Sequence, residues 1–332
     1  MVQKVLWRWN KRELEKDTVR PFFLAKFTSN FGSKRNHFVV YGLPAIASAL
    51  GAYTTANVKA VNGQNWIVDD QRPATPGYKK KKYDEAMQSI RNVLEHLKID
   101  TERQKLEITF TGNLIAASGV GASAAQCTSL ARALNDSFNL KLDDEKINEA
   151  AYEGEKAYHG TPSGIDNTVS TYGGLIWFVK NLSGGKNTMD FLQSPKKMPL
   201  IIANSGITAS TTEVVADVRR LKEVNSEEFE KILNEYKALS EKAKRALLEG
   251  DITTIGKLMN QNHKLLKIIT VSGEINDKLV EIALKNGAIG AKMTGTGRGG
   301  LVIALAENEK MQESIAKAIE KEGYDAWRTM IG

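Results

Sequence analysis

A glycine-rich segment between an apolar run and a helix-like pattern is the first feature of this sequence that could do chemistry. It reads Gly-Val-Gly-Ala-Ser-Ala-Ala over residues 119–125. Gly119 and Gly121 would let the backbone approach a ligand closely, and the first N–H groups of the following helix can bind a polyphosphate. Ser123 would then present its hydroxyl to a phosphate-bound Mg²⁺. Small residues at a helix start also serve simple close packing, so the segment alone leaves both interpretations open.

Two further segments favour phosphate chemistry. Residues 159–167 read His-Gly-Thr-Pro-Ser-Gly-Ile-Asp-Asn, which places the carboxylate of Asp166 in a tight turn. Residues 292–300 read Lys-Met-Thr-Gly-Thr-Gly-Arg-Gly-Gly, a second glycine-rich loop. The pattern G-x-x-x-x-G-K-[ST] does not occur in the chain, which excludes a Walker-type P-loop as the phosphate binder.

These three segments, in this order, resemble the motifs of the GHMP kinases, the superfamily of galactokinase, homoserine kinase, mevalonate kinase and phosphomevalonate kinase. Within it the chain looks like the mevalonate kinases, on residues 70–78, 159–167 and 210–215. The likeness covers roughly residues 37–332. It implies an ATP-dependent kinase that phosphorylates the C5 hydroxyl of mevalonate in the pathway to isoprenoids. Another small-molecule kinase of the superfamily, or an inactive nucleotide-binding homologue, are the alternatives.

The resemblance also implies roles for individual residues. Mg²⁺ would be held by Ser123 and Glu155, with phosphate and water completing the shell, and Asp166 would be the catalytic carboxylate beside the C5 hydroxyl. The implied ATP-binding residues are Gly119, Gly121, Ala122, Ser123 and Ala124, and the implied substrate-binding residues are His37, Gly295 and Gly297.

Purely structural roles stay open for several of these residues. Glu155 could be exposed on its helix, Asp166 could cap the helix that follows its turn, and His37 could be an ordinary strand histidine. Arg298 stands where the family commonly has a glycine, so it could steer anions or face solvent.

The family's first motif, approximately G-K-x-x-L-F-G-E-H, is missing ahead of His37. The register of its lysine holds Asn30, and the register of its glutamate holds Asn36. A missing cation beside the alcohol raises the cost of ionising it and leaves Asp166 without its partner. The sequence therefore predicts a chain with little or no activity, and a sheet edge that lacks its usual strand.

The genetic code offers an explanation for the missing motif. Residues 13–26 can be encoded by codons that, after an added G, read Gly-Thr-Gly-Lys-Gly-Tyr-Gly-Lys-Ala-Val-Leu-Phe-Gly-Glu in the neighbouring frame. This is the absent motif, with its lysine and glutamate. We therefore interpret residues 1–36 as an atypical basic segment translated out of frame, the alternative being a natural basic extension that packs on the surface. The frame hypothesis does not explain residues 27–36.

Charge and composition exclude other classes of function. Of the formal net charge of +7, residues 1–36 carry +6, so the other 296 residues are close to neutral and nucleic-acid binding is not expected. Residues 79–82 are a second basic run, which a solvated loop explains. No stretch has the roughly 20 apolar residues of a membrane span, and the chain has no signal-peptide pattern, so a cytoplasmic enzyme is expected. A homodimer is left open as its assembly. The single Cys127 is expected in the core.

The elements that must position these motifs follow from the hydrophobic pattern. Strands and helices mix without the regular alternation of a doubly wound sheet, which favours an α+β class. The resemblance implies the two-lobed GHMP kinase fold, with an N-terminal lobe like domain 2 of ribosomal protein S5 and a ferredoxin-like C-terminal lobe. We place the lobes at residues 37–185 and 186–332, with the boundary in a Ser-Gly-Gly turn.

Overall fold

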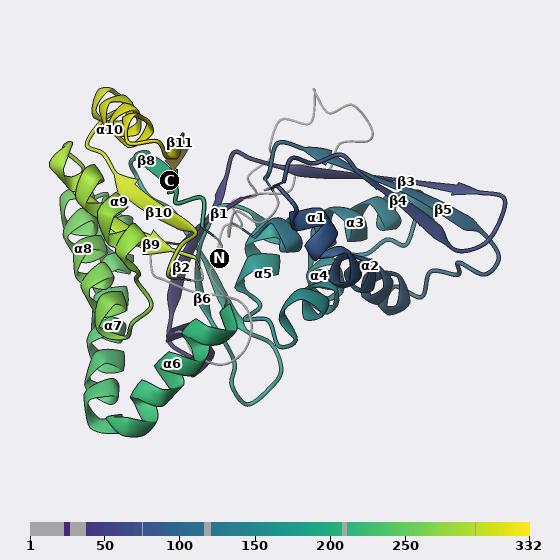
Figure 1. Cartoon of the computed structure of the whole chain (residues 1–332). Helices are drawn as coiled ribbons and strands as arrows, with labels where there is room; N and C mark the ends of the chain where they lie inside the picture. Colours follow the sequence, from purple (N-terminus) through teal and green to yellow (C-terminus); the bar gives the residue numbers. More distant parts are fainter. Residues whose placement is uncertain (1–22, 27–37, 75, 116–120, 208–210, 296) are drawn as a thin grey trace, which may run out of the picture.

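The computed structural model describes residues 23–26, 38–74, 76–115, 121–207, 211–295 and 297–332. The strands in these residues form three sheets, surrounded by helices, as the α+β prediction requires (Figure 1). His37, Gly119 and most of the segment 1–36 lie outside the described residues, so what we expect of them remains a prediction.

The N-terminal half contains most of the predicted chemistry. Its elements are β1 Phe23–Lys26, the 3₁₀ turn η1 Phe38–Tyr41, β2 Ala45–Leu50, β3 Thr54–Val61, β4 Trp66–Asp70, α1 Tyr78–Lys81, α2 Tyr83–His96, β5 Lys105–Gly112, α3 Ala122–Phe138, α4 Asp144–His159, α5 Ile165–Tyr172, β6 Leu175–Val179 and β7 Thr188–Leu192.

The C-terminal half is richer in long helices. Its elements are β8 Met198–Asn204, α6 Thr211–Val224, α7 Ser226–Glu249, α8 Ile252–Ile268, α9 Glu274–Lys285, β9 Gly290–Thr294, β10 Leu301–Leu305, α10 Glu309–Lys321 and β11 Asp325–Ile331.

A central sheet of order β1–β2–β6–β7 joins the two halves. Successive residues of a strand face opposite sides, and here both sides are covered. Ala45 and Ala47 of β2 pack in one core with Ile165 of α5, whereas Ile46 and Trp177 belong to a larger core shared with β8 and α7. Burial on both faces explains why β2 and β6 are nearly continuous apolar runs.

β1 covers the outer edge of β2. Phe23 pairs with Leu50 and Lys26 pairs with Ala47 in an antiparallel ladder. The edge that the sequence predicted to be without its usual strand therefore has a strand of four residues against it.

The second sheet, of order β3–β5–β4, carries the elements that lead to the predicted phosphate loop. Alternate residues of β5, Leu106, Ile108 and Phe110, are buried in a core formed with α2, α3 and α4. β4 runs parallel to β5, because α1 and α2 form the crossover between them. Because the two strands are parallel, Asp70 at the end of β4 lies beside Phe110 near the end of β5. The chain continues from that end of β5 to α3.

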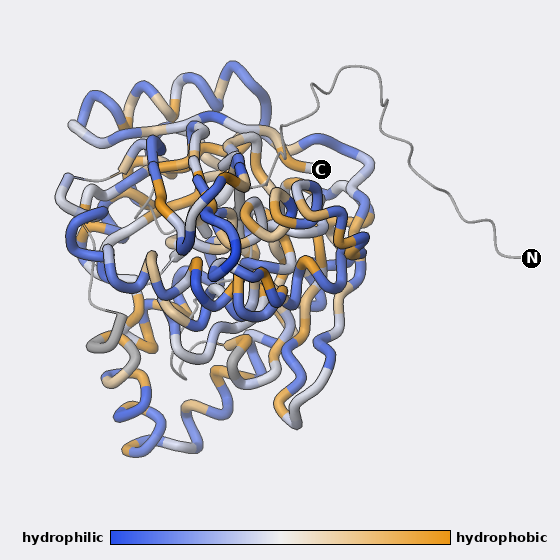
Figure 2. The backbone as a smooth tube through the Cα atoms, turned by 90° about the vertical axis from the view of Figure 1, so that its right-hand side faces the viewer, coloured by the Kyte–Doolittle hydropathy of each residue, from blue (hydrophilic) through white to orange (hydrophobic). Residues whose placement is uncertain are grey.

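The third sheet, of order β11–β8–β10–β9, is antiparallel throughout and packs against α8, α9 and α10. These covering helices are amphipathic, as the alternating colours of α10 at the top of Figure 2 show. The face of the central sheet that carries Ile46 and Trp177 packs against α7. There the Tyr236 hydroxyl donates to the Pro44 carbonyl at 3.0 Å, and the Tyr236 ring stacks on Phe38. This buried contact attaches the long helix to the central sheet.

The sequence pattern of residues 38–41, an apolar run directly before Gly42, predicts a strand, but the run is the 3₁₀ turn η1. Phe38 and Val39 face two different cores, and Gly42, at φ 73°, ends the turn. The Ser-Gly-Gly turn lies inside a hairpin, since β6 and β7 pair on either side of it. A lobe boundary after Leu192 would keep the central sheet whole.

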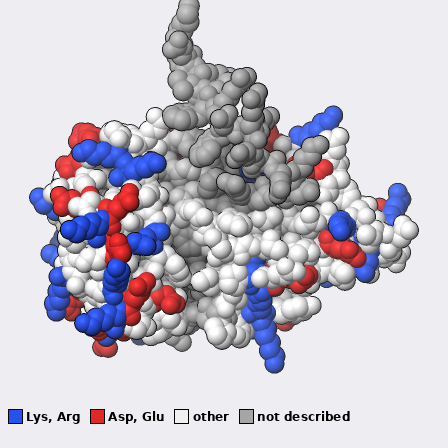
Figure 3. Space-filling model, turned by 90° about the horizontal axis from the view of Figure 1, so that it is seen from above, with Lys and Arg blue, Asp and Glu red and all other residues white. Residues whose placement is uncertain are grey.

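Surface charges of both signs lie side by side over the C-terminal helices (Figure 3). Many of these charges are paired one helical turn apart, as in Lys285 with Glu281 at 2.6 Å and Lys317 with Glu313 at 2.7 Å. This arrangement agrees with the near-neutral charge of the chain beyond residue 36.

We predict that Gly290→Ala destabilises the protein. A Cβ at Gly290 would lie 2.2 Å from the Gly256 carbonyl oxygen of α8, so the helix would have to move away from β9. Overpacking of this kind costs about 1–3 kcal/mol. Denaturant unfolding measures the change. Gly51→Ala is the matched control, because no heavy atom lies within 4 Å of its new Cβ; equal stability of the two variants would contradict the prediction.

We also predict that His263 makes the protein sensitive to mild acid. Its Nδ1 accepts from the Met293 N–H at 3.3 Å and its Nε2 lies 3.1 Å from Asp277. Burial lowers the pKa of His263 to about 4, with Lys292 and Lys267 adding to the shift and Asp277 opposing it. The unfolded chain binds this proton first, so the residue's contribution to stability falls as the pH drops from about 6.5 towards 4.

The measurement is the free energy of unfolding of wild type and His263→Gln at several pH values between 7 and 4. The wild type should lose more stability than the variant over that range. Parallel curves would show that His263 does not titrate as proposed.

Candidate functional site

The start of α3 has the geometry of an anion site. Gly121 is its N-cap with φ 78°, and the first helical bond is the one that the Ala125 N–H donates to the Gly121 carbonyl. The N–H groups of residues 122–124 precede that bond, so they have no acceptor within the helix. Ala122 and Ala124 are buried, whereas Ser123 is partly exposed and lines a cavity of about 630 Å³. Ala122 and Ser123 thus line the cavity, and Ala124 packs inward.

The cavity is lined by side chains of two kinds. Polar ones lie at the start of α3, where Arg72 contacts Ala122 and Gln126, and Gln126 contacts Tyr158. The rest of the lining combines charged side chains with aromatic and aliphatic ones: Trp66, Ile67, Val68, Asp70, Tyr78, Lys79, Lys82, Tyr83, Ala86, Met87 and Arg91. Free helix N–H groups, cations and aromatic side chains in one cavity suit a ligand with an anionic part and a flat ring.

Glu155 of α4 is close to this cavity and almost completely buried, with 1% of its side chain exposed. The alternative of a solvent-exposed glutamate is therefore wrong. Its Oε2 lies 3.7 Å from His159 Nε2. Burial raises the pKa values of Tyr78 and Tyr158, both on the cavity wall, and the negative charge of Glu155 raises them further. The carboxylate thus acts electrostatically on the cavity.

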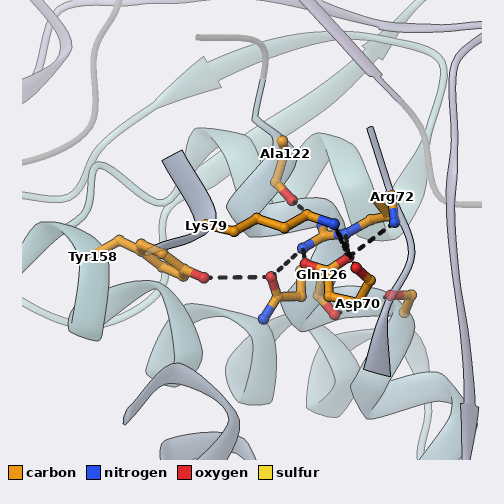
Figure 4. Close-up of polar contacts among 7 residues, drawn as sticks. Asp70, Arg72, Lys79, Ala122, Gln126 and Tyr158 are labelled. Carbon is orange, nitrogen blue, oxygen red and sulfur yellow. Dashed lines mark hydrogen bonds and ion pairs between the residues drawn. The ribbon is translucent and has the colours of Figure 1, made fainter. Parts of the chain in front are cut away.

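A buried arginine connects the two helices that carry Ser123 and Glu155 (Figure 4). Arg72 follows β4 and donates to the Ala122 carbonyl at 3.3 Å and to Gln126 Oε1 at 2.6 Å. The same Gln126 oxygen accepts from the Tyr158 hydroxyl of α4 at 3.3 Å. Ala122 is next to Ser123, and Tyr158 is one turn beyond Glu155, so this end of α3 and this end of α4 lie together.

Asp70 holds the arginine from the other side. Its two carboxylate oxygens accept from Arg72 Nε at 2.9 Å and Nη2 at 2.7 Å, and Lys79 donates to its backbone carbonyl. Burial raises the pKa of Asp70, but the hydrogen bonds and charge of Arg72 outweigh that effect and hold the pKa below its usual value. The pair is therefore ionised at neutral pH.

Asp166 lies in the first turn of α5, directly after α4. The helix is capped by Gly164 at φ 88°, so the alternative that Asp166 is the capping residue is wrong. The turn is fixed to α4 by Asn167, whose Nδ2 donates to Asn148 Oδ1 at 2.7 Å. Asp166 is half-buried and stands at the corner where α4 ends, the end of α4 that also carries Glu155.

The second glycine loop is shaped by the protein's own backbone. A Cβ at Gly297, which has φ 92°, would lie 2.3 Å from the Val271 carbonyl oxygen, and one at Gly299 would lie 2.6 Å from the Ile207 carbonyl oxygen. Gly295 has φ 104°, which also favours glycine. These described contacts are with C-terminal elements, and a substrate-binding role of Gly295 and Gly297 stays a prediction.

The Arg298 side chain in that loop is bound to the protein itself, so it is neither free to attract anions nor simply exposed to solvent. Its Nη1 lies 2.6 Å from Asp217 Oδ2 of α6, and its Nε donates to the Thr270 carbonyl at 3.1 Å. These bonds hold it at φ 49°, a conformation that glycine adopts more easily. Arg298 therefore connects the loop to α6.

Sequence reasoning singled out Ser123, Glu155 and Asp166, but it assigned no role to Arg72, Gln126 and Tyr158. The segment of residues 70–78 had been singled out for its likeness alone. Asp-x-Arg directly after a strand was a usable signal, because an arginine buried at a strand end needs an acid beside it. Cys127 is buried as predicted, beside Ser89.

Two absences concern only the part of the chain that the structure describes. No group of three or more His, Cys, Asp or Glu side chains is arranged there to hold a metal ion. Within the same residues, no helix has the length and apolar character needed to cross a bilayer.

Comparison with known proteins gives the same family over both halves of the chain. Residues 86–174 match the GHMP kinase N-terminal domain, and residues 243–325 match the GHMP kinase C-terminal domain. The mevalonate kinase of Pyrococcus horikoshii is 33% identical in an alignment of length 306 that covers 86% of this chain and 89% of that protein.

Solved structures agree with the sequence matches. The mevalonate kinase of L. major, crystallised with R-mevalonate, is 36% identical with a TM-score of 0.87, and the alignment covers 96% of each chain. The mevalonate kinase of Methanococcus jannaschii, at 23% identity and a TM-score of 0.76 over 95% of this chain and 98% of that one, shares the fold. The helices, sheets and glycine-rich turns described above are thus those of a known enzyme family, and the chain belongs to the mevalonate kinases of the GHMP kinase superfamily.

Proposed function

We propose that this chain binds Mg-ATP in the cavity beside Ser123 and directs its γ-phosphoryl group to the C5 hydroxyl of mevalonate. The observation that carries the proposal is the free first turn of α3 on the wall of that cavity, in a chain 36% identical to a structure that holds R-mevalonate. The N–H groups of residues 122–124 would bind the phosphates, and aromatic side chains of the cavity wall would pack against the base.

The residues present fit a magnesium ion held together with a nucleotide. Ser123 offers a hydroxyl and Glu155 a carboxylate, both hard oxygen donors, and a protein site with few ligands suits Mg²⁺, which keeps waters and substrate phosphates in its shell. When bound, the ion neutralises charge on the phosphates. The buried charge of Glu155 and its effect on Tyr78 and Tyr158 support its assignment to this role.

Asp166 would accept or orient the proton of the C5 hydroxyl. Phosphoryl transfer requires little covalent chemistry from the protein, so position and electrostatics decide the rate. The turn before α5, which the bond between Asn167 and Asn148 fixes to α4, would position Asp166. The cation that the family places beside this carboxylate is missing from the sequence, which makes chemistry the weak step of this chain and nucleotide binding the strong one.

The geometry of β1 supports the frame hypothesis for residues 1–36. Codons that can encode Phe23–Lys26 read Leu-Phe-Gly-Glu, the end of the missing motif, in the alternative frame. These same four positions form the strand that pairs with β2. A strand at this place and in this part of the chain is what the intact motif would supply.

A catalytically inactive nucleotide-binding protein remains the second candidate function. The observation that favours it is the pair Asn30 and Asn36 at the registers of the motif's lysine and glutamate. Both candidates share the nucleotide site and differ only in turnover, so one experiment separates them.

We predict that Ser123→Ala and Glu155→Gln weaken the binding of Mg-ADP much more than the binding of metal-free ADP. Loss of one ligand from a site with so few removes a large part of the protein's hold on the ion. Calorimetric titration with ADP, in Mg²⁺ and in EDTA, measures both. Asp166→Asn, which changes a neighbouring carboxylate, should bind Mg-ADP like the wild type; equal affinities for all four proteins in Mg²⁺ would refute the metal assignment.

We predict that restoring the first motif restores turnover. In the variant, residues 13–36 are replaced by the fourteen-residue peptide of the alternative frame, so that its glutamate directly precedes His37. ADP release with mevalonate and Mg-ATP should rise by at least about 10²-fold, the usual effect of one well-placed electrostatic group. The restored chain carrying Asp166→Asn should lose that gain.

Two results would decide against the assignments. High turnover by the unaltered chain would show that the missing lysine is not needed. No turnover by the restored chain, with Mg-ADP still bound, would favour the inactive binding protein.

A further inference from the structure

The contacts of Arg72 go beyond those that a buried arginine needs for its own charge. Asp70 alone neutralises the guanidinium through two hydrogen bonds. The remaining donors reach across about fifty positions of sequence to Ala122 and Gln126 on the first turns of α3. The Arg72 side chain, which is only 3% exposed, therefore also donates hydrogen bonds to the start of the helix that carries Ser123.

Arg72 itself is held in place by two neighbours, Asp70 and Phe110. Asp70 fixes the guanidinium from the end of β4, and the Phe110 ring lies against it with 5.3 Å between the guanidinium carbon and the ring centroid. Its own backbone N–H donates to Asp70 Oδ1 at 3.1 Å. A planar group restrained in this way provides donors at fixed positions rather than a mobile charge.

Gln126 extends the connection to the second helix. Its Oε1 has two lone pairs, and both are used, one by Arg72 Nη2 and one by the Tyr158 hydroxyl. Gln126 is 3% exposed, so both bonds are made away from water. Tyr158 lies three residues beyond Glu155 on α4, on the same side of the helix.

We propose that Arg72 is a positioning residue for the metal–nucleotide site: through Ala122 and Gln126 it sets the separation of Ser123 on α3 from Glu155 on α4. The proposal rests on the proposed function, in which these two side chains share one Mg²⁺. Arg72 contacts neither of them directly. It acts through the backbone of α3 and through Tyr158, so its loss should affect the ion more than the nucleotide.

A lysine cannot replace Arg72 in this role. Its single ammonium group can pair with Asp70, but it lacks the planar fork that reaches Asp70, Ala122 and Gln126 at once. Arg72→Lys therefore keeps the buried charge paired while releasing the start of α3. Tyr158→Phe is the gentler second variant, because it removes only the hydrogen bond between Gln126 and α4 and keeps the ring.

The test is titration with ADP of the full chain and its variants, once with a series of Mg²⁺ concentrations and once in EDTA. Residues behind the ligands of a metal typically alter its affinity by about 10- to 100-fold. We expect Arg72→Lys to raise the Mg²⁺ concentration needed for half-saturation by about that factor, and Tyr158→Phe by less, with the affinity for metal-free ADP unchanged in both.

Arg91→Lys is the matched control. Arg91 lines the same cavity, but it is exposed, and within the described residues it makes no hydrogen bond or ion pair. This variant should show the Mg²⁺ dependence of the wild type. Thermal melting of each variant confirms that it is folded at the temperature of the titration.

The outcomes separate this proposal from the one on which it rests. If Ser123→Ala and Glu155→Gln leave the Mg²⁺ dependence unchanged, the metal assignment itself fails. If those two weaken Mg²⁺ binding while Arg72→Lys behaves as wild type, only the positioning role is overturned. A loss of ADP affinity in Arg72→Lys that is equal with Mg²⁺ and with EDTA also overturns it, since a general defect of the cavity would then explain the result.

Discussion

The hydrogen bonds that the Arg72 side chain makes across the end of β4, the start of α3 and the end of α4 are the interaction on which the site depends. Each of these elements belongs to the small sheet β3–β5–β4 or to a helix that covers it. Apolar packing sets their general arrangement but does not fix a helix along its axis to a few tenths of an ångström, whereas hydrogen bonds at 2.6–3.3 Å do. The site is therefore placed by polar contacts inside an apolar frame.

The glycine-rich segments obey two different constraints. Gly121 is a helix cap with a positive φ, a conformation that glycine adopts without strain. Gly297 and Gly299 have positive φ as well, but each is also pressed against a carbonyl of the protein itself. In the first case glycine suits the backbone conformation, and in the second its missing Cβ also allows close backbone packing. Equal composition in two loops does not imply equal function.

Local patterns are sufficient for some elements. The glycine-rich segment of residues 119–125 predicts a helix that starts near Ser123, and α3 begins at Ala122; the alternation of Leu106, Ile108 and Phe110 predicts β5. The residues of β4, Trp66–Asp70, show no such alternation in sequence, because three apolar residues are followed by two acidic ones, although exposure alternates along the strand. η1 was mistaken for a strand because an apolar run that faces two cores has no periodicity.

The candidate site shows the same division between local and long-range information. Ser123, Glu155 and Asp166 stand in motifs of contiguous residues, so likeness to a family could mark them. The contact of Arg72 with Gln126 spans 54 positions, and no local pattern encodes it. The pairing of β1 with β2 lies between these cases. A strand at that place pairs the backbone N–H and C=O groups along the outer edge of β2, a need that many sequences can meet. The fold thus tolerates different segments at this edge of the sheet, whereas the proposed phosphoryl transfer depends on a lysine and a glutamate whose registers hold Asn30 and Asn36.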